Sequence, residues 1–235
     1  METKIETLAE FHERTGFFTQ HSLPDHGELC LNPNLSKKVD ETGDFLPYYG
    51  NTVVFCLPES AKERIRALQA ALYTASGSIL ARQLDPATFH ITLHDLANGP
   101  SPALMEQEVP QIQQHALDLV GALQAEVGAI RLHSSCLFNM VNTSMVLGFV
   151  PSDEESCHRL MTFYQRLQEV LRLDYPLTPH VTVAYFRPGR ICTEDVAKLN
   201  KVIAHWKCEP ALTLELCGAD LAYQLFSSMN HYWTP

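Results

Sequence analysis

The sequence predicts a pseudo-symmetric α+β fold made of two lobes, and three observations support this prediction. The chain has 235 residues, of which 46% are hydrophobic and 19% charged, enough for one large domain or two closely packed lobes. An order of strand, helix, strand, helix, strand occurs twice along it. Each copy also carries a strand with the pattern His-x-Thr, His90 to Thr92 in the first and His180 to Thr182 in the second.

The helices and strands of the first copy are predicted from hydrophobic periodicity and from residues that typically begin or end such elements. A β-branched, aromatic run that ends at a proline predicts a buried strand. A capping-box pattern, Ser60 followed by Glu63, then predicts a helix whose apolar positions recur at helical spacing. In order, the expected elements are a strand over 51–58, this helix, a strand over 89–93, a helix over 112–123 and a strand over 129–138.

The second copy repeats the same signals at nearly the same distances. His90 follows the proline that closes the first strand by 32 residues, and His180 follows the corresponding proline by 29. The expected elements are a strand over 142–151, a helix behind the capping box of Ser152 and Glu155, a strand over 180–183, a helix over 196–206 and strands over 211–217 and 220–227. We therefore expect a bilobal domain over 45–235 with halves over 45–140 and 141–235, after an extension over 1–44 with a short helix (1–14) and a loop (23–43).

Charge and composition exclude several function classes. The formal net charge of −10 argues against a broad grip on the phosphates of duplex DNA or RNA. No secretory signal and no apolar run long enough to cross a membrane is visible. Seven scattered cysteines without a C-x-x-C pair are typical of reduced, mostly packed thiols, so a cytoplasmic location is expected.

The two His-x-Thr strands indicate acid–base chemistry. Side chains at i and i+2 share a face of a strand, so His90 lies beside Thr92, and His180 beside Thr182. If the halves face each other, one imidazole can act as the base and the other as the acid. Hydroxyl groups beside them can donate hydrogen bonds to the oxygens of a phosphate. The set suits cleavage of a phosphodiester without a metal or other cofactor.

Two H-x-T-x strands ninety residues apart, in duplicated α/β units, resemble the two-histidine (2H) phosphoesterase superfamily. That superfamily includes RNA 2′,3′-cyclic phosphodiesterases, bacterial 2′–5′ RNA ligase-like proteins and ADP-ribose cyclic phosphate hydrolases. The segment Phe45 to Val54 also resembles an uncharacterised bacterial and fungal branch of it. The resemblance implies two antiparallel or mixed sheets lining a central groove, with helices outside. It further implies that His90 and His180 carry the acid and base work, that Thr92 and Thr182 bind the phosphate, and that the substrate is a small nucleotide or a short RNA-like phosphodiester.

Further residues are weaker candidates for binding substrate. His94 lies at i+4 from His90 and is expected to extend its face, whereas Ala184 occupies the matching position of the second strand. Tyr48 and Tyr49 precede the first strand, where they are placed to stack on a base; packing at the edge of the lobe is equally compatible with them.

Two alternatives stay open at this point. His90, His94 and His180, with Asp95, would also suit a metal-dependent hydrolase. A nucleotide-binding module with little catalysis would carry the same motifs.

Overall fold

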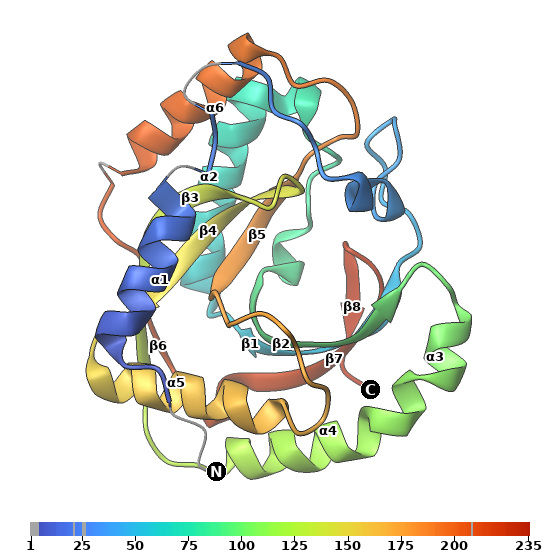
Figure 1. Ribbon diagram of the computed structural model, residues 1–235, viewed down its shortest axis with the longest axis vertical. Coiled ribbons are helices and arrows are strands. Elements are labelled where there is room, and N and C mark those ends of the chain that lie inside the picture. Colours follow the sequence, from blue (N-terminus) through green and yellow to red (C-terminus); the bar gives the residue numbers. More distant parts are fainter. Residues whose placement is uncertain (1–4, 21, 25–26, 208) are drawn as a thin grey trace.

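The computed structural model describes residues 5–20, 22–24, 27–207 and 209–235. Its strands form two antiparallel sheets of four, in the orders β2-β1-β7-β8 and β5-β4-β3-β6 (Figure 1). The strands are β1 (Tyr49–Cys56), β2 (His90–Gly99), β3 (Ile130–Met140), β4 (Ser144–Pro151), β5 (His180–Tyr185), β6 (Thr213–Leu216), β7 (Leu221–Ser228) and β8 (His231–Trp233).

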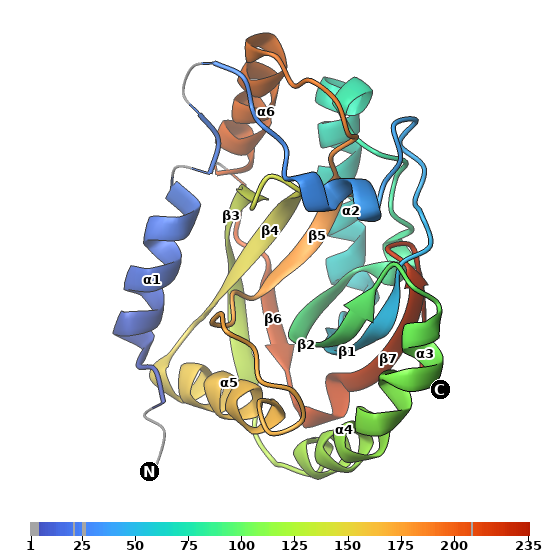
Figure 2. The same ribbon diagram turned by 45° about the vertical axis from the view of Figure 1, so that its right-hand side comes forward.

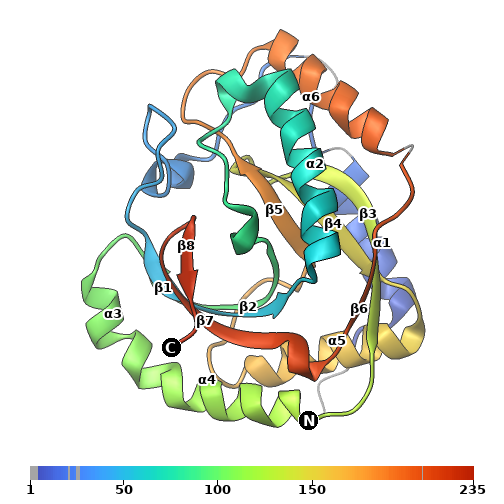
Figure 3. The same cartoon turned by 180° about the vertical axis from the view of Figure 1, so that it is seen from behind.

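The helices lie outside the two sheets (Figures 1 and 3). They are α1 (Leu8–Gln20), α2 (Glu59–Ser76), α3 (Ala103–Gln107), α4 (Val109–Gln124), α5 (Glu154–Leu167) and α6 (Thr193–Trp206). Helices α2 and α6 pack on the β5-β4-β3-β6 sheet, whereas α3 and α4 pack on the other sheet. The predicted α+β class, with two sheets and outer helices, is confirmed, and both sheets are antiparallel rather than mixed.

Each sheet combines strands from both copies of the repeat. Strand β3 ends the first copy but pairs with β4, and β7 comes from the second copy but pairs with β1. The first two strands of each copy, β1 with β2 and β4 with β5, stay together as antiparallel pairs, whereas β6 of the second copy pairs with β3. This exchange ties the two lobes to each other through backbone hydrogen bonds.

The expected elements are present with shifted ends, and both predicted capping boxes are wrong. Helix α2 begins at Glu59 behind Pro58, whose extended backbone turns the chain out of β1 without a side-chain cap. Helix α5 is capped by Asp153, whose carboxylate accepts a hydrogen bond of 2.7 Å from the amide of Ser156. An aspartate at this position satisfies a free amide as well as serine would, which makes Ser152 unnecessary as a cap.

The cysteine prediction is met in part. The six described cysteines are free thiols. Cys157 is buried, Cys30 and Cys56 are exposed, and the other three are partly buried, so four of the six are at least partly packed; Cys208 lies outside the described residues. None of the helices in the described ranges is both long and apolar enough to span a bilayer.

The segment before the repeat packs along the outside of the second sheet. The helix expected over 1–14 runs instead over Leu8–Gln20, and residues 1–4 lie outside the described part of the chain. Helix α1 contacts β3 and α5 (Figure 2), and its residue Phe11 is fully buried. Farther along, the amide of Asn32 donates to the carbonyl of Asn142 at the β3–β4 turn, 3.0 Å away, which fixes the segment at one end of the sheet.

Candidate active site

The two motif strands face each other at the centre of the molecule. Each is the edge strand of its sheet, and β2 and β5 are in contact where the sheets meet. His90, Thr92, His180 and Thr182 line a single cavity of about 530 Å³ between them. That volume is in the range of small-molecule sites. The structure therefore brings together the four residues of the paired motif.

Both imidazole rings are held by a carbonyl group two residues earlier. Nδ1 of His180 lies 2.7 Å from the carbonyl oxygen of Thr178, and the ring of His90 forms a hydrogen bond with the backbone of Thr88. Because a carbonyl oxygen only accepts, the bonded nitrogen carries the proton in the neutral ring. Nε2 of His180 is then the nitrogen available as a base.

This anchoring has a sequence signal that extends the motif. The chain reads Pro86-Ala-Thr-Phe-His90-Ile-Thr92 in one copy and Pro176-Leu-Thr-Pro-His180-Val-Thr182 in the other. The shared pattern P-x-T-x-H-x-T includes both threonines whose carbonyls hold the rings. This longer pattern is a stronger sign of duplication than His-x-Thr alone, and it marks the anchoring threonines that the shorter motif misses.

Burial lowers the pKa of both histidines. Removal of water from around the ring lowers the pKa of His90 to about 4, with a smaller effect in the same direction from the charge of His180. Burial also lowers the pKa of His180. The carbonyl bonds and the negative charge of Asp95 oppose these shifts at both rings. Both imidazole rings are therefore neutral at pH 7 in the unliganded protein.

A β-bulge at the same place in both motif strands changes the predicted face. Thr92 pairs with Val54 and His94 with the adjacent Val53, so one extra residue, Leu93, lies in β2. In β5, Val183 is extra in the same way. Each bulge shifts the alternation by one residue. After the histidine and the threonine, the next residue of each strand that faces the cavity therefore lies five residues after the histidine and not four.

Asp95 and Tyr185 occupy these third positions, and both line the cavity. His94, expected on the face of His90, is instead only 1% exposed and borders the cavity from within the wall. Its Nδ1 is bonded to the carbonyl of Asp95, its ring lies against that of Tyr164, and its Nε2 has no partner among the described residues. The alternation of side chains along a strand does not reveal a β-bulge. The predicted position of His94 on the face of His90 is therefore wrong.

The two tyrosines before the first strand separate. Tyr48 lines the cavity, stacks on Phe226 with the ring centroids 6.5 Å apart, and donates from its hydroxyl to Asn98 at 2.9 Å. Tyr49, the next residue, is half-buried in β1 and is not among the residues that line the cavity. Successive side chains of a strand point to opposite faces, so only Tyr48 is placed for contact with a ligand.

Several cavity residues were missed from the sequence. A narrow pocket of about 30 Å³ is lined by the four motif residues together with Tyr185, Met229 and Tyr232. The ring of Tyr232 meets that of His90 edge to face, with the centroids 5.0 Å apart. Tyr232 lies in the three-residue strand β8, which is too short for a periodic signal. Its contact with His90 supplies part of the burial that lowers the pKa of that ring.

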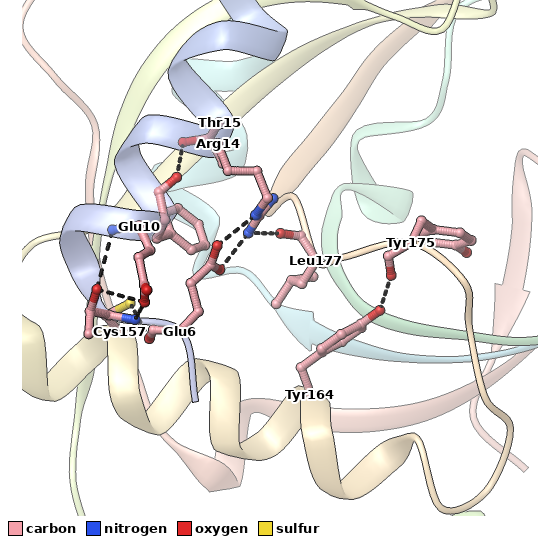
Figure 4. Close-up of polar contacts among 10 residues, drawn as sticks. Glu6, Glu10, Arg14, Thr15, Cys157, Tyr164, Tyr175 and Leu177 are labelled. Atoms are coloured by element: carbon pink, nitrogen blue, oxygen red, sulfur yellow. Dashed lines mark hydrogen bonds and ion pairs between the residues drawn. The ribbon is translucent and has the colours of Figure 1, made fainter. Parts of the chain in front are cut away.

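The loop before β5 is held from two sides (Figure 4). Arg14 of α1 forms two hydrogen bonds of 2.8 Å with Glu6 and donates to the carbonyl of Leu177 at 2.9 Å. The hydroxyl of Tyr164 donates to the carbonyl of Tyr175, whose own hydroxyl donates to Asp95 at 3.0 Å. These contacts position the backbone immediately before Thr178 and His180.

The ligand set of the metal-dependent alternative is not assembled. Across the described ranges, no three histidine, cysteine, aspartate or glutamate side chains are grouped so that they could hold one metal ion together. His94 in particular is turned to the carbonyl of Asp95.

No protein-family model and no curated protein matches this chain. Among solved structures, a conserved protein of unknown function, ATU0111 from Agrobacterium tumefaciens, is similar at 16% identity and a TM-score of 0.63, over 88% of this chain and 93% of that one. Escherichia coli LigT complexed with 3′-AMP is 12% identical with a TM-score of 0.47, over 80% and 95% of the two chains. TT0787 of Thermus thermophilus is 15% identical with a TM-score of 0.47, over 78% and 93%. This chain shares its fold with the Agrobacterium protein, which has the highest TM-score of the three.

Proposed function

We propose that this protein is a phosphodiesterase that opens a cyclic phosphate, or cleaves a short nucleotide phosphodiester, by acid–base catalysis between His90 and His180 without a metal ion. One observation carries the proposal: the two histidines of the repeat line one cavity from facing edge strands, and each ring has a hydrogen bond to the backbone two residues earlier. This geometry supports two proton-transfer groups that act on one phosphorus atom.

In the proposed reaction, one neutral histidine takes a proton from water through Nε2 while the water oxygen attacks phosphorus. The bond from phosphorus to the leaving sugar oxygen breaks, and that oxygen takes a proton from the other, protonated histidine. A cyclic diester becomes a monoester, and the two histidines exchange protonation states. Exchange with solvent then restores the starting state.

The threonines and the substrate charge complete the scheme. The hydroxyls of Thr92 and Thr182 are placed to donate to the non-bridging phosphate oxygens, where negative charge is concentrated. The anionic diester, once bound, favours the protonated form of a nearby imidazole. In this way, substrate binding supplies the acid that the unliganded site lacks at neutral pH.

A panel of substrates tests the proposal. Adenosine 2′,3′-cyclic phosphate, 3′,5′-cyclic AMP, a 2′–5′-linked dinucleotide and an ADP-ribose cyclic phosphate are incubated with the protein and followed by phosphorus NMR. The His90→Ala and His180→Ala variants serve as negative controls. His133→Ala is the matched control, because His133 is another strand histidine but does not line this cavity.

The account predicts a new phosphomonoester signal with at least one substrate, retained in His133→Ala and in the presence of a chelator. Binding of 3′-AMP by calorimetry with no product from any substrate would favour a nucleotide-binding module instead. Loss of activity on chelation, restored by zinc or manganese, would support the metal-dependent alternative.

A further inference from the structure

The cavity holds a lysine from outside the repeat. Lys38 follows a short 3₁₀ helix, Pro33–Lys37, in the extension before the first copy. Its Nζ lies 4.9 Å from the ring centroid of Tyr48 and 6.0 Å from that of Tyr185. All three residues line the same cavity as the motif histidines. The extension therefore contributes a positive charge to the site.

The main chain around Lys38 is firmly held. Its amide donates to the carbonyl of Leu35 at 2.9 Å, and its carbonyl accepts from the amide of Leu46 at 2.9 Å. The next residue, Val39, is fully buried and forms a β-bridge with Phe45. This backbone directs the ammonium group toward the cavity without help from a ligand.

Lys38 lacks the anionic partner that an enclosed ammonium group usually has. Among the described residues, no carboxylate lies within 4.0 Å of its Nζ. Burial lowers the pKa of Lys38, and the only charge that opposes this shift is the more distant Asp95, whose carboxylate accepts from Tyr175. Arg14, the other lysine or arginine in the cavity wall, is neutralised by Glu6. An enclosed charge without a partner is costly, so its retention points to an anionic ligand.

Hydroxyl groups gather at the same end of the cavity. Ser144 is the register partner of Tyr185, the residue over which Lys38 lies, and its hydroxyl lies 3.4 Å from that of Thr143, which can also donate to the carbonyl of Met140 at 3.0 Å. Thr143 and Ser144 both line the cavity. A lysine with adjacent hydroxyls is a donor set that suits the oxygens of a phosphate.

We propose that Lys38, with Thr143 and Ser144, forms a subsite for a second anionic group, and that the preferred substrate is a nucleotide phosphodiester carrying an additional phosphate. This rests on the proposed function, which assigns the reacting phosphate to the two histidines. The second group is either a terminal phosphate or the next diester of a short chain, and both present the same oxygens to Lys38.

The test compares substrates that differ only in the additional phosphate. These are adenosine 2′,3′-cyclic phosphate, the same compound with a 5′-phosphate, and a dinucleotide ending in a 2′,3′-cyclic phosphate. The ratio of kcat/KM with and without the additional phosphate is measured for wild type, Lys38→Met and Lys38→Arg. Lys37→Met is the matched control, since it removes an exposed charge one residue away.

We expect wild type to favour a substrate with the additional phosphate by on the order of 10- to 100-fold, as for a hydrogen bond between charged groups. Lys38→Met abolishes this preference, while Lys38→Arg and Lys37→Met keep most of it. Preference for the 5′-phosphate alone identifies a terminal group, and preference for the dinucleotide identifies an internal diester. Equal kcat/KM for all three substrates in wild type, or an unchanged ratio in Lys38→Met, would overturn the subsite.

A binding measurement separates this inference from the proposed function. Calorimetry with adenosine 3′-monophosphate and adenosine 3′,5′-bisphosphate needs no turnover. If no substrate is hydrolysed but the bisphosphate binds at least tenfold more tightly and loses this advantage in Lys38→Met, the subsite stands and the enzymatic role fails. If a substrate is hydrolysed but the bisphosphate binds no more tightly than the monophosphate, the enzymatic role stands and the subsite fails.

Discussion

The ring of His180 donates through Nδ1 to the carbonyl oxygen of Thr178, 2.7 Å away, and the ring of His90 forms a hydrogen bond with the backbone of Thr88. In each case the anchoring residue lies two positions before the histidine, where its strand begins. This bond sets the orientation of the ring and its tautomer before any ligand arrives. The symmetry of the site is therefore present in its hydrogen bonds as well as in its motifs.

The tautomer of both rings can be tested directly. We predict that at pH 7.5 both His90 and His180 are neutral and carry their proton on the nitrogen bonded to the carbonyl. Nitrogen-15 NMR of histidine-labelled protein, assigned with His90→Gln and His180→Gln, reports the proton position. A neutral His180 ring with its proton on Nε2 would contradict the hydrogen bond from Nδ1 to Thr178.

The pH dependence follows from the lowered pKa values. Catalysis needs one neutral and one protonated histidine, a form that is most abundant between the two pKa values of the pair. Since the pKa of His90 is about 4 and that of His180 lies below its usual 6.5, kcat/KM peaks below pH 6.5. It falls as the pH rises above that value. A maximum above pH 7 in a pH–rate profile would be inconsistent with two buried rings.

Asp95 tunes the same profile. Its negative charge raises the pKa of both histidines, so Asp95→Asn lowers both values and moves the profile of kcat/KM to lower pH. Tyr175→Phe is the control, because it removes the hydrogen bond to Asp95 and leaves the charge in place. An unchanged profile in Asp95→Asn would show that the carboxylate does not act on the rings.

The threonine hydroxyls are predicted to act in binding phosphate. Thr92→Val and Thr182→Val keep the branched shape that suits a strand and remove one donor each. The loss of one hydrogen bond to a charged group lowers kcat/KM by about 10- to 100-fold. Thr→Ser at either position keeps the hydroxyl and most of the activity. Equal kcat/KM for the valine variants and wild type would assign the threonines to the strand alone.

Much of the fold was readable from the sequence because it rests on local patterns. The strands that carry His90 and His180 and the helices between them follow from periodicity and from the repeat. Which strands pair does not follow from these patterns. Strands β3 and β4 form a hairpin across the boundary between the two copies, and the pairing of β7 with β1 depends on contacts distant in sequence.

The site was also predictable in part. The four motif residues were found from the repeated His-x-Thr pattern and its spacing. Asp95 and Tyr185 were hidden by the bulges at Leu93 and Val183, which shift the alternation by one residue. Lys38 lies in a segment without periodicity, so only the folded chain shows that it reaches the cavity.

The most direct test of the central claim is a double-mutant cycle on kcat/KM with His90→Ala, His180→Ala and the double variant, using a substrate identified by the panel. Each single change is predicted to cost about 10²- to 10⁴-fold. The double variant is predicted to lose little more than the worse single one, because the two rings act on the same phosphate as a unit. A folded single variant with a near wild-type rate, or losses that multiply in the double variant, would contradict a shared catalytic site.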